Sequence, residues 1–151
     1  GRQAALQGYT LVSGNARGAD RAAQESCLEN GGKVISVVAD ELWKQPLREN
    51  GLWLSEDGFA EEFSSQRALS RNRVIHALGL KTFVAQATAG MGGTWDGTVK
   101  NLRFGWSGVF CYEDGSEAMA QLSRMGAQLI GLQELGSIYD LQNSEINIFD
   151  R

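Results

Sequence analysis

The chain has 151 residues, the length of one ordinary domain and enough to form a hydrophobic core without disulfides or metals. Its formal net charge of −4 excludes binding to nucleic acid through overall positive charge, so an anion must be held by a local group of arginines and backbone amides. Cys27, Cys111 and the single histidine have no metal-ligand spacing, so we expect two buried thiols, no metal and no cofactor. No apolar run has transmembrane length and no signal peptide is visible, which makes the cytoplasm the expected location.

Short apolar runs alternate with segments of helical period along the chain. The run at 1–7 has the pattern of the end of a helix, and since such a helix normally follows a strand, we expect a strand and most of this helix to precede residue 1. The first half then predicts, in chain order, a strand at 9–13, a helix at 19–30, a strand at 33–38, a short helix or covering loop at 39–49, a strand at 51–55, a polar loop at 56–65 and a helix at 66–78.

The predicted helix at 19–30 is amphipathic. A face of small residues is expected to pack on the sheet, and Gly-Gly at 31–32 ends the helix. The opposite face is expected to contact water through Arg21, Gln24, Glu25 and Glu29.

The second half continues the alternation. It predicts a strand at 81–85, a Gly-rich loop at 88–94, a helix at 95–104, a strand at 108–111, a helix at 116–125, a strand at 128–130, a helix at 132–141 and a loose tail at 142–151. Strand–helix alternation with short turns predicts parallel strands joined by right-handed crossovers. We therefore predict one α/β domain over 1–151, with a Rossmann-like, doubly wound, mostly parallel sheet and helices on both faces.

The first candidate site is the turn between the strand at 9–13 and the helix at 19–30. In an open parallel sheet, ligands bind at the carboxyl ends of the strands, where helix N-termini present free N–H groups. Gly14 and Gly18 permit a tight turn around an anion, and Arg17 can hold a phosphate with two N–H groups. Ser13 can donate its hydroxyl hydrogen, and Asp20 can cap free amides in the first helical turn. The spacing alone fits equally well a strand–helix turn with a surface arginine. We assign to the phosphate-binding loop Ser13, Gly14, Asn15, Ala16, Arg17, Gly18 and Asp20.

The second candidate site is the basic start of the helix at 66–78. Arg71 aligns with the apolar face of this helix, and because burying an unpaired charge is costly, its guanidinium is expected to reach the edge of the sheet rather than the core. Arg67 lies one turn earlier on the same side, whereas Arg73 points away and fits an exposed basic face. We assign Arg67, Arg71, Asn72 and Arg73 to the anion site. His76 is expected to face solvent.

The third candidate is the Gly-rich loop, whose glycines permit close approach of a ligand to the backbone. We add Gly92, Gly93 and Thr94 to the site, with Thr94 as a candidate helix cap; a flexible turn explains the loop equally well when it is taken alone. Other chemistry is weaker, because Glu56 and Asp57 fit a solvated acidic loop better than general bases and no Ser–His–Asp or Cys–His pattern exists. The spacing of the four tryptophans favours packing in the core or at the edge of the domain, and the best exceptions, as candidates for stacking on bases, are Trp43 and Trp95.

Three linked segments resemble the DprA/Smf family of DNA-processing proteins. The stretch SGNARGADRAAQESCLENGGKVISVVA resembles its Ser-Gly-x-Ala-x-Gly-x-Asp signature with the following helix, Gly-Gly and apolar strand. LWLSE resembles its next strand, and RALSRNRVIHALG resembles its Arg-Asn-Arg-x-Ile helix. The resemblance covers 9 to about 93, in the family's order. The leading strand with its Gly-Ser-Arg loop and the C-terminal winged-helix domain of many members have no counterpart in this sequence.

The resemblance implies a domain that binds single-stranded DNA and helps to load a recombinase during recombination and the uptake of transforming DNA, without catalysis or a metal. It carries the phosphate role onto Ser13, Gly14, Arg17 and Gly18, and a site role onto Arg71 and Arg73. The expected partners are single-stranded DNA or a nucleotide, a recombinase and a second copy of the chain in a homodimer, with no membrane.

Two alternatives to DNA binding stay open. One is hydrolysis of the N-glycosidic bond of a nucleoside monophosphate, as in the related LOG-like phosphoribohydrolases. Their Gly-Gly-x-Gly-Thr-x-x-Glu loop is only loosely similar to the segment at 92–98, which has no glutamate and offers Asp96 as a poor substitute. The other is a non-catalytic domain that senses a small nucleotide.

Overall fold

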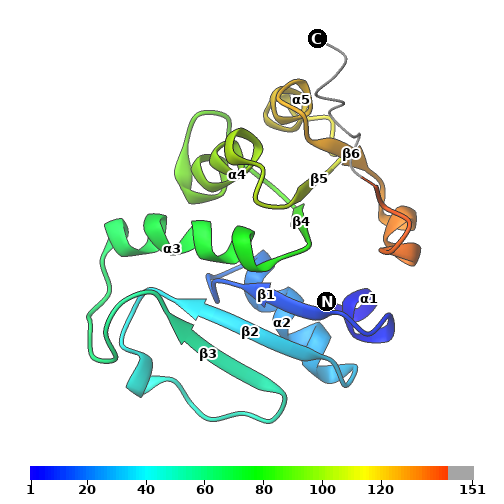
Figure 1. The fold of residues 1–151 in the computed structure, drawn as a ribbon. Coiled ribbons are helices and arrows are strands. Elements are labelled where there is room, and N and C mark those ends of the chain that lie inside the picture. The colour runs from blue at the N-terminus through cyan, green and yellow to red at the C-terminus, as the bar shows by residue number, and fades with distance from the viewer. Residues whose placement is uncertain (143–151) are drawn as a thin grey trace. The chain divides into compact units, whose positions relative to one another are not determined.

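The structure is a computed structural model, and it describes residues 1–142. The chain divides into two compact units, Gly1–Gly79 and Leu80–Arg151 (Figure 1). Apart from Gln142, the predicted loose tail at 142–151 lies outside the described residues. Within the described part of the chain, no helix combines the length and the apolar character that a membrane span requires.

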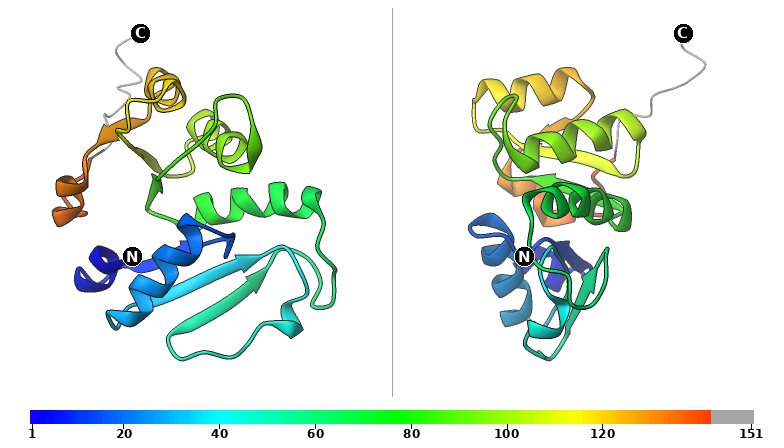
Figure 2. Two further views of the ribbon diagram at one scale, coloured as in Figure 1. Left: turned by 180° about the vertical axis from the view of Figure 1, so that it is seen from behind. Right: turned by 90° about the vertical axis from the view of Figure 1, so that its left-hand side faces the viewer.

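The first unit is built on three parallel strands in the order β1-β2-β3. Their arrowheads point the same way in Figure 1, so their carboxyl ends share one edge of the sheet. Helix α2 packs on β1 and β2, as the rear view of Figure 2 shows, and α3 also packs on these two strands. The elements of this unit are α1 (Arg2–Leu6), β1 (Thr10–Ser13), α2 (Ala19–Glu29), β2 (Lys33–Val38), the 3₁₀ helix η1 (Leu42–Lys44), β3 (Gly51–Ser55) and α3 (Ser65–Leu78).

Local sequence explains the ends of these elements. Strand β2 is almost entirely apolar and buried, as expected for the central strand of a parallel sheet. Helix α2 ends where Gly31 adopts a φ of 76°, and the N–H of Gly32 donates to the carbonyl of Cys27 at 2.9 Å. Helix α3 begins after Ser64, whose hydroxyl accepts a hydrogen bond from the N–H of Arg67 at 3.0 Å.

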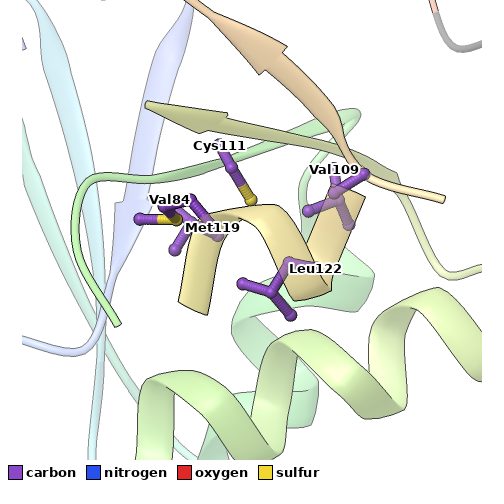
Figure 3. Close-up of a cluster of buried hydrophobic side chains, with 6 residues drawn as sticks. Val84, Val109, Cys111, Met119 and Leu122 are labelled. Carbon is purple, nitrogen blue, oxygen red and sulfur yellow. The ribbon is translucent and has the colours of Figure 1, made fainter. Parts of the chain in front are cut away.

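The second unit has a parallel sheet of its own, in the order β4-β5-β6. Its core lies between this sheet and its helices; Figure 3 shows Cys111 and Val109 of β5 close to Met119 and Leu122 of α5. The elements of this unit are β4 (Lys81–Val84), α4 (Gly92–Phe104), β5 (Gly108–Tyr112), α5 (Glu117–Arg124), β6 (Gln128–Ile130) and the 3₁₀ helix η2 (Leu132–Ser137).

The predicted α/β class is confirmed: parallel strands alternate with helices in a Rossmann-like arrangement. The strands are hydrogen-bonded as two three-stranded sheets, one in each unit, and the single domain over 1–151 stays a prediction. The buried state predicted for Cys27 and Cys111 is confirmed, since both side chains are fully buried. The segment at 39–49 contains the short helix η1 in a loop, as expected.

Predictions about α4, the last helix and α3 were wrong. Helix α4 begins at Gly92 with Met91 as its N-cap, so Thr94 lies inside the first turn and is not the cap. The last helix is the 3₁₀ turn η2 and does not reach residue 141. His76, expected to face solvent, is buried. The face of α3 that packs on the rest of the unit contains Arg71 and His76, whereas Leu78, expected on the buried face, is exposed.

The burial of His76 predicts a pH dependence of folding. Burial lowers the pKa of His76 below its ordinary value of 6.5, because the charged imidazolium loses hydration in the folded state. The unfolded chain therefore binds this proton more readily, and the free energy of unfolding should decrease as the pH falls below about 6.5. Urea unfolding between pH 8 and pH 5.5 measures this decrease. The variant His76→Gln should lose most of it in this range, and an unchanged pH profile in the variant would show that other groups cause the dependence.

Candidate phosphate-binding site

The side chain of Arg71 joins the carboxyl ends of β1 and β2. From the middle of α3 its Nη1 donates to the carbonyl oxygen of Gly14 and to that of Val37, each at 2.7 Å. Only 8% of Arg71 is exposed, and burial lowers the pKa of its guanidinium while Asp20 and Asp40 act in the opposite direction. A guanidinium so placed gives two carbonyls a hydrogen-bond donor in a buried position, where a polar group without a partner is costly.

Gly14 has to be glycine because the Arg71 guanidinium lies against it. A Cβ atom at position 14 would lie 3.0 Å from both Cζ and Nη1 of Arg71, and 3.1 Å from the terminal carbon of Ile75. These distances are tighter than most real contacts, so a side chain at position 14 would require Arg71 or Ile75 to shift by a few tenths of an ångström.

The 13–20 loop is held in one shape by its own polar groups. The Asp20 carboxylate accepts hydrogen bonds from the N–H groups of Gly14 at 3.0 Å and Ala16 at 3.2 Å. The Nε of Arg21 donates to the carbonyl of Asn15 at 3.3 Å, and Asn15 itself adopts a φ of 58°, which asparagine tolerates better than most residues. Asp20 therefore caps two amides of the loop rather than the amides of the first turn of α2, which has no side-chain cap. Two of the amides assigned to the phosphate, those of Gly14 and Ala16, therefore already have a carboxylate partner.

Arg17 is the exposed charge of this loop. Within residues 1–142 it makes no hydrogen bond or ion pair, and it directly precedes Gly18, the N-cap residue of α2. Gly18 has a φ of 90° and provides no side-chain cap, so no side chain of the N-cap residue occupies the first amides of α2. Arg17 directly precedes these residues in the sequence. An exposed arginine one residue before the N-cap of a helix is a combination that favours a phosphate.

Ser13 takes part in a buried polar cluster, which we define as Ser13, Gln24, Ser36 and Arg48. The side-chain amide of Gln24 contacts the hydroxyl of Ser13 and accepts from Ser36 Oγ at 3.0 Å and from Arg48 Nη1 at 3.2 Å. Arg48 also donates to Ser36 at 2.6 Å and lies over the Trp53 ring, 4.1 Å from its centroid. The sequence prediction that Gln24 faces water was wrong, since it is 2% exposed. The signal that it missed is a pair of serines, Ser13 and Ser36, opposite each other in otherwise apolar strands.

The other two arginines of α3 are already paired. Arg67 donates to the Asp57 carboxylate at 2.9 Å, to the carbonyls of Ala39, Glu61 and Glu62 between 2.6 and 2.9 Å, and to Ser55 Oγ at 3.1 Å. These bonds fasten the loop after β3. Arg73 pairs with Glu56, which also accepts from Ser70, and its side chain is 59% exposed. Asn72, between Arg71 and Arg73, is half-buried.

The residues assigned from the Gly-rich loop belong to the second unit. Gly92, Gly93 and Thr94 form the first turn of α4, and Gly92 adopts a φ of 83° that other residues rarely accept. Asp96, the carboxylate compared with the glutamate of the phosphoribohydrolases, pairs with Lys100 at 2.8 Å. The structure thus brings Arg71 of α3 to the 13–20 loop, whereas Arg67 and Arg73 contact the segments around the end of β3 and the Gly-rich loop is part of the second unit.

The fold and the site define a class: a Rossmann-like α/β protein with a preformed, arginine-bearing turn at the carboxyl edge of a parallel sheet. The family model of DNA recombination-mediator protein A matches residues 1–130. Because this match covers most of the chain, the chain belongs to this family, and the resemblance to DprA/Smf proteins is confirmed. A search of curated proteins finds no match.

Two solved structures of the same family are similar to the chain. The X-ray structure of DNA processing protein A from Streptococcus pneumoniae has 28% sequence identity and a TM-score of 0.73, over 93% of this chain and 56% of that one. DNA processing protein A from Helicobacter pylori, a structure concerned with single-stranded DNA binding, has 26% identity and a TM-score of 0.72, over 85% of this chain and 64% of that one. The chain therefore spans less than two thirds of each of these proteins.

The contacts of Arg71 predict a large loss of stability when it is replaced. In Arg71→Met the carbonyls of Gly14 and Val37 lose their donor, so the free energy of unfolding should fall by about 2 to 4 kcal/mol. Arg73→Met, two residues further along the same helix, removes only an exposed ion pair, so it should cost at most about 1 kcal/mol. Chemical denaturation of both variants makes the comparison, and equal losses would contradict the assigned role of Arg71.

Proposed function

We propose that the chain binds single-stranded DNA at the carboxyl edge of the β1-β2-β3 sheet, with Arg17 as its main contact to the phosphate backbone. The observation that carries the proposal is the exposure of Arg17, without a partner among the described residues, in a loop fixed on both sides by Asp20 and Arg71. Membership of the recombination-mediator family, and a solved relative concerned with single-stranded DNA binding, support this choice of ligand.

Local charge is sufficient for this role in an acidic chain. Arg71 lies beneath the loop and carries a second positive charge, and the described contacts of its guanidinium are to carbonyl oxygens rather than carboxylates. Since Asp20 holds the amides of Gly14 and Ala16, we assign the phosphate to the Arg17 side chain and to the N–H groups at the start of α2. The other assigned residues would then fix the structure of this edge of the sheet and would not provide an unpaired positive charge. These residues are Ser13, Asn15, Asn72, Arg67 and Arg73.

Trp43 offers a surface on which an unpaired base can stack. Its side chain is 55% exposed in η1, which follows the carboxyl end of β2, and the Lys44 ammonium lies 5.3 Å from the centroid of its ring. An exposed indole suits a single strand, because bases of any kind can stack on it. The ammonium beside it is already paired with Glu41 at 2.6 Å, so we assign to Trp43 a stacking role alone. In the second unit, Gly92, Gly93 and Thr94 would offer a separate backbone contact to nucleic acid.

In the cell this binding would support DNA recombination. We propose that the chain, as part of a recombination-mediator protein, holds single strands in the cytoplasm for loading of a recombinase, including strands taken up during transformation. A second copy of the chain would extend the binding surface along the strand, as expected for a homodimer. Neither step requires a metal or a cofactor.

The variant Arg17→Ala tests the assigned contact. It should weaken binding to an oligothymidylate about tenfold, because one charge-assisted phosphate contact is lost. It should also reduce the slope of log K against log salt concentration by about 0.7. The matched control is Lys33→Ala, which removes the same charge at the amino end of β2, the opposite edge of the sheet, and should leave both quantities unchanged.

Fluorescence anisotropy at several salt concentrations gives the affinities and the slopes. Equal effects of Arg17→Ala and Lys33→Ala on the affinity would contradict the assigned site, because the loss of any positive charge would then weaken binding to the same degree. Release of a free base from a nucleoside monophosphate, without salt-dependent binding to single strands, would contradict the proposed function in favour of an enzyme.

A further inference from the structure

The buried cluster of Ser13, Gln24, Ser36 and Arg48 fixes the orientation of one amide. A guanidinium can only donate hydrogen bonds, so the atom of the Gln24 side chain that lies 3.2 Å from Arg48 Nη1 must be the carbonyl oxygen. The same oxygen accepts from Ser36 Oγ at 3.0 Å. The opposite end of the amide, its NH₂ group, therefore faces Ser13.

This orientation determines what the Ser13 hydroxyl can do. Its oxygen accepts from Gln24 Nε2, so its own hydrogen cannot point back along that bond. Among residues 1–142 no acceptor for this hydrogen is found, although the residue is only 7% exposed. Ser13 is the last residue of β1 and the first of the 13–20 loop, at the edge where the phosphate is proposed to lie.

Arg48 keeps Gln24 in this orientation. It reaches back from the segment before β3, and its guanidinium lies over the Trp53 ring while donating to both Gln24 and Ser36. Trp53 in turn donates from Nε1 to the carbonyl of Pro46 at 2.8 Å, which fixes the segment that carries Arg48. Arg48 therefore donates to Gln24, and Gln24 donates to Ser13; because arginine cannot accept, this direction is fixed.

We infer that Gln24 is a positioning residue for the nucleic-acid site: held by Arg48 and Ser36, it directs the hydroxyl hydrogen of Ser13 toward a backbone phosphate of single-stranded DNA. The inference rests on the proposed function and goes beyond it, because it assigns a role in binding to two residues, Gln24 and Arg48, that do not touch the ligand. It also explains why a glutamine occupies the buried side of α2, where an apolar residue would pack at lower cost.

The variant Gln24→Glu reverses the direction of the hydrogen bond between residue 24 and Ser13. A glutamate has nearly the same shape and can still accept from Arg48 and Ser36, but its second oxygen cannot donate to Ser13. The serine would then donate to the glutamate, and its hydrogen would be lost to the phosphate. The added negative charge also weakens anion binding by itself, so the effect has to be measured in two backgrounds.

The experiment is a double-mutant cycle on the affinity for an oligothymidylate, with Ser13→Ala, Gln24→Glu and the double variant compared with the unaltered chain. Ser13→Ala and Gln24→Glu should each weaken binding about tenfold, the effect of one hydrogen bond to a charged group. In the Ser13→Ala background, Gln24→Glu should weaken binding much less, because no hydroxyl remains to be redirected. The control is Lys33→Ala, at the opposite edge of the sheet and outside the cluster, which should leave the affinity unchanged.

Equal fold-changes for Gln24→Glu in both backgrounds would overturn the inference, since added charge alone would then account for the effect. An unaltered chain that fails to bind single strands would overturn the proposed function and this inference together. If melting curves show that Gln24→Glu does not fold, Gln24→Met replaces it in the cycle. The methionine adds no charge and gives Ser13 no donor, so its loss of affinity must again disappear in the Ser13→Ala background.

Discussion

The first unit depends on one buried guanidinium. Arg71 reaches from α3 to the carbonyls of Gly14 and Val37, and so joins a helix to the ends of two neighbouring strands. Parallel strands end with carbonyls that have no partner in the sheet, and a ligand can approach this edge only if those groups are satisfied from within. The arginine does this with a permanent positive charge, and its close packing against position 14 explains why a glycine stands there.

The arginines near this edge have different tasks, although they look alike in the sequence. Arg71 fixes the end of β1, Arg67 fastens the loop after β3, Arg48 orients a buried glutamine, and Arg73 pairs with a carboxylate on the surface. Each of them has at least one hydrogen-bond partner inside the protein. Arg17 differs because the loop around it is fixed by other groups while its own guanidinium stays exposed, which is the arrangement that a phosphate-binding residue requires.

Much of the fold followed from the sequence, because the signals for it are local. The apolar runs that form β1, β2 and β5, and the glycines that end α2, are signals of neighbouring residues, and these elements were predicted correctly. The site was harder to predict, since its contacts join residues far apart in the chain. The carbonyl partners of Arg71, the burial of Gln24 and the part played by Arg48 arise from packing, and a helical wheel does not show which polar residue the sheet will cover.

The central claim is that a fixed loop at the carboxyl edge of the first sheet meets the phosphates of a single strand. The most direct test is to follow backbone amide and indole chemical shifts while an oligothymidylate is added. The account predicts that the largest changes occur at Arg17, Gly18 and Ala19 and at the indole of Trp43. It predicts little change at Lys33 and Gly51, where β2 and β3 begin. Shifts concentrated at those two residues, with the 13–20 loop unaffected, would contradict it.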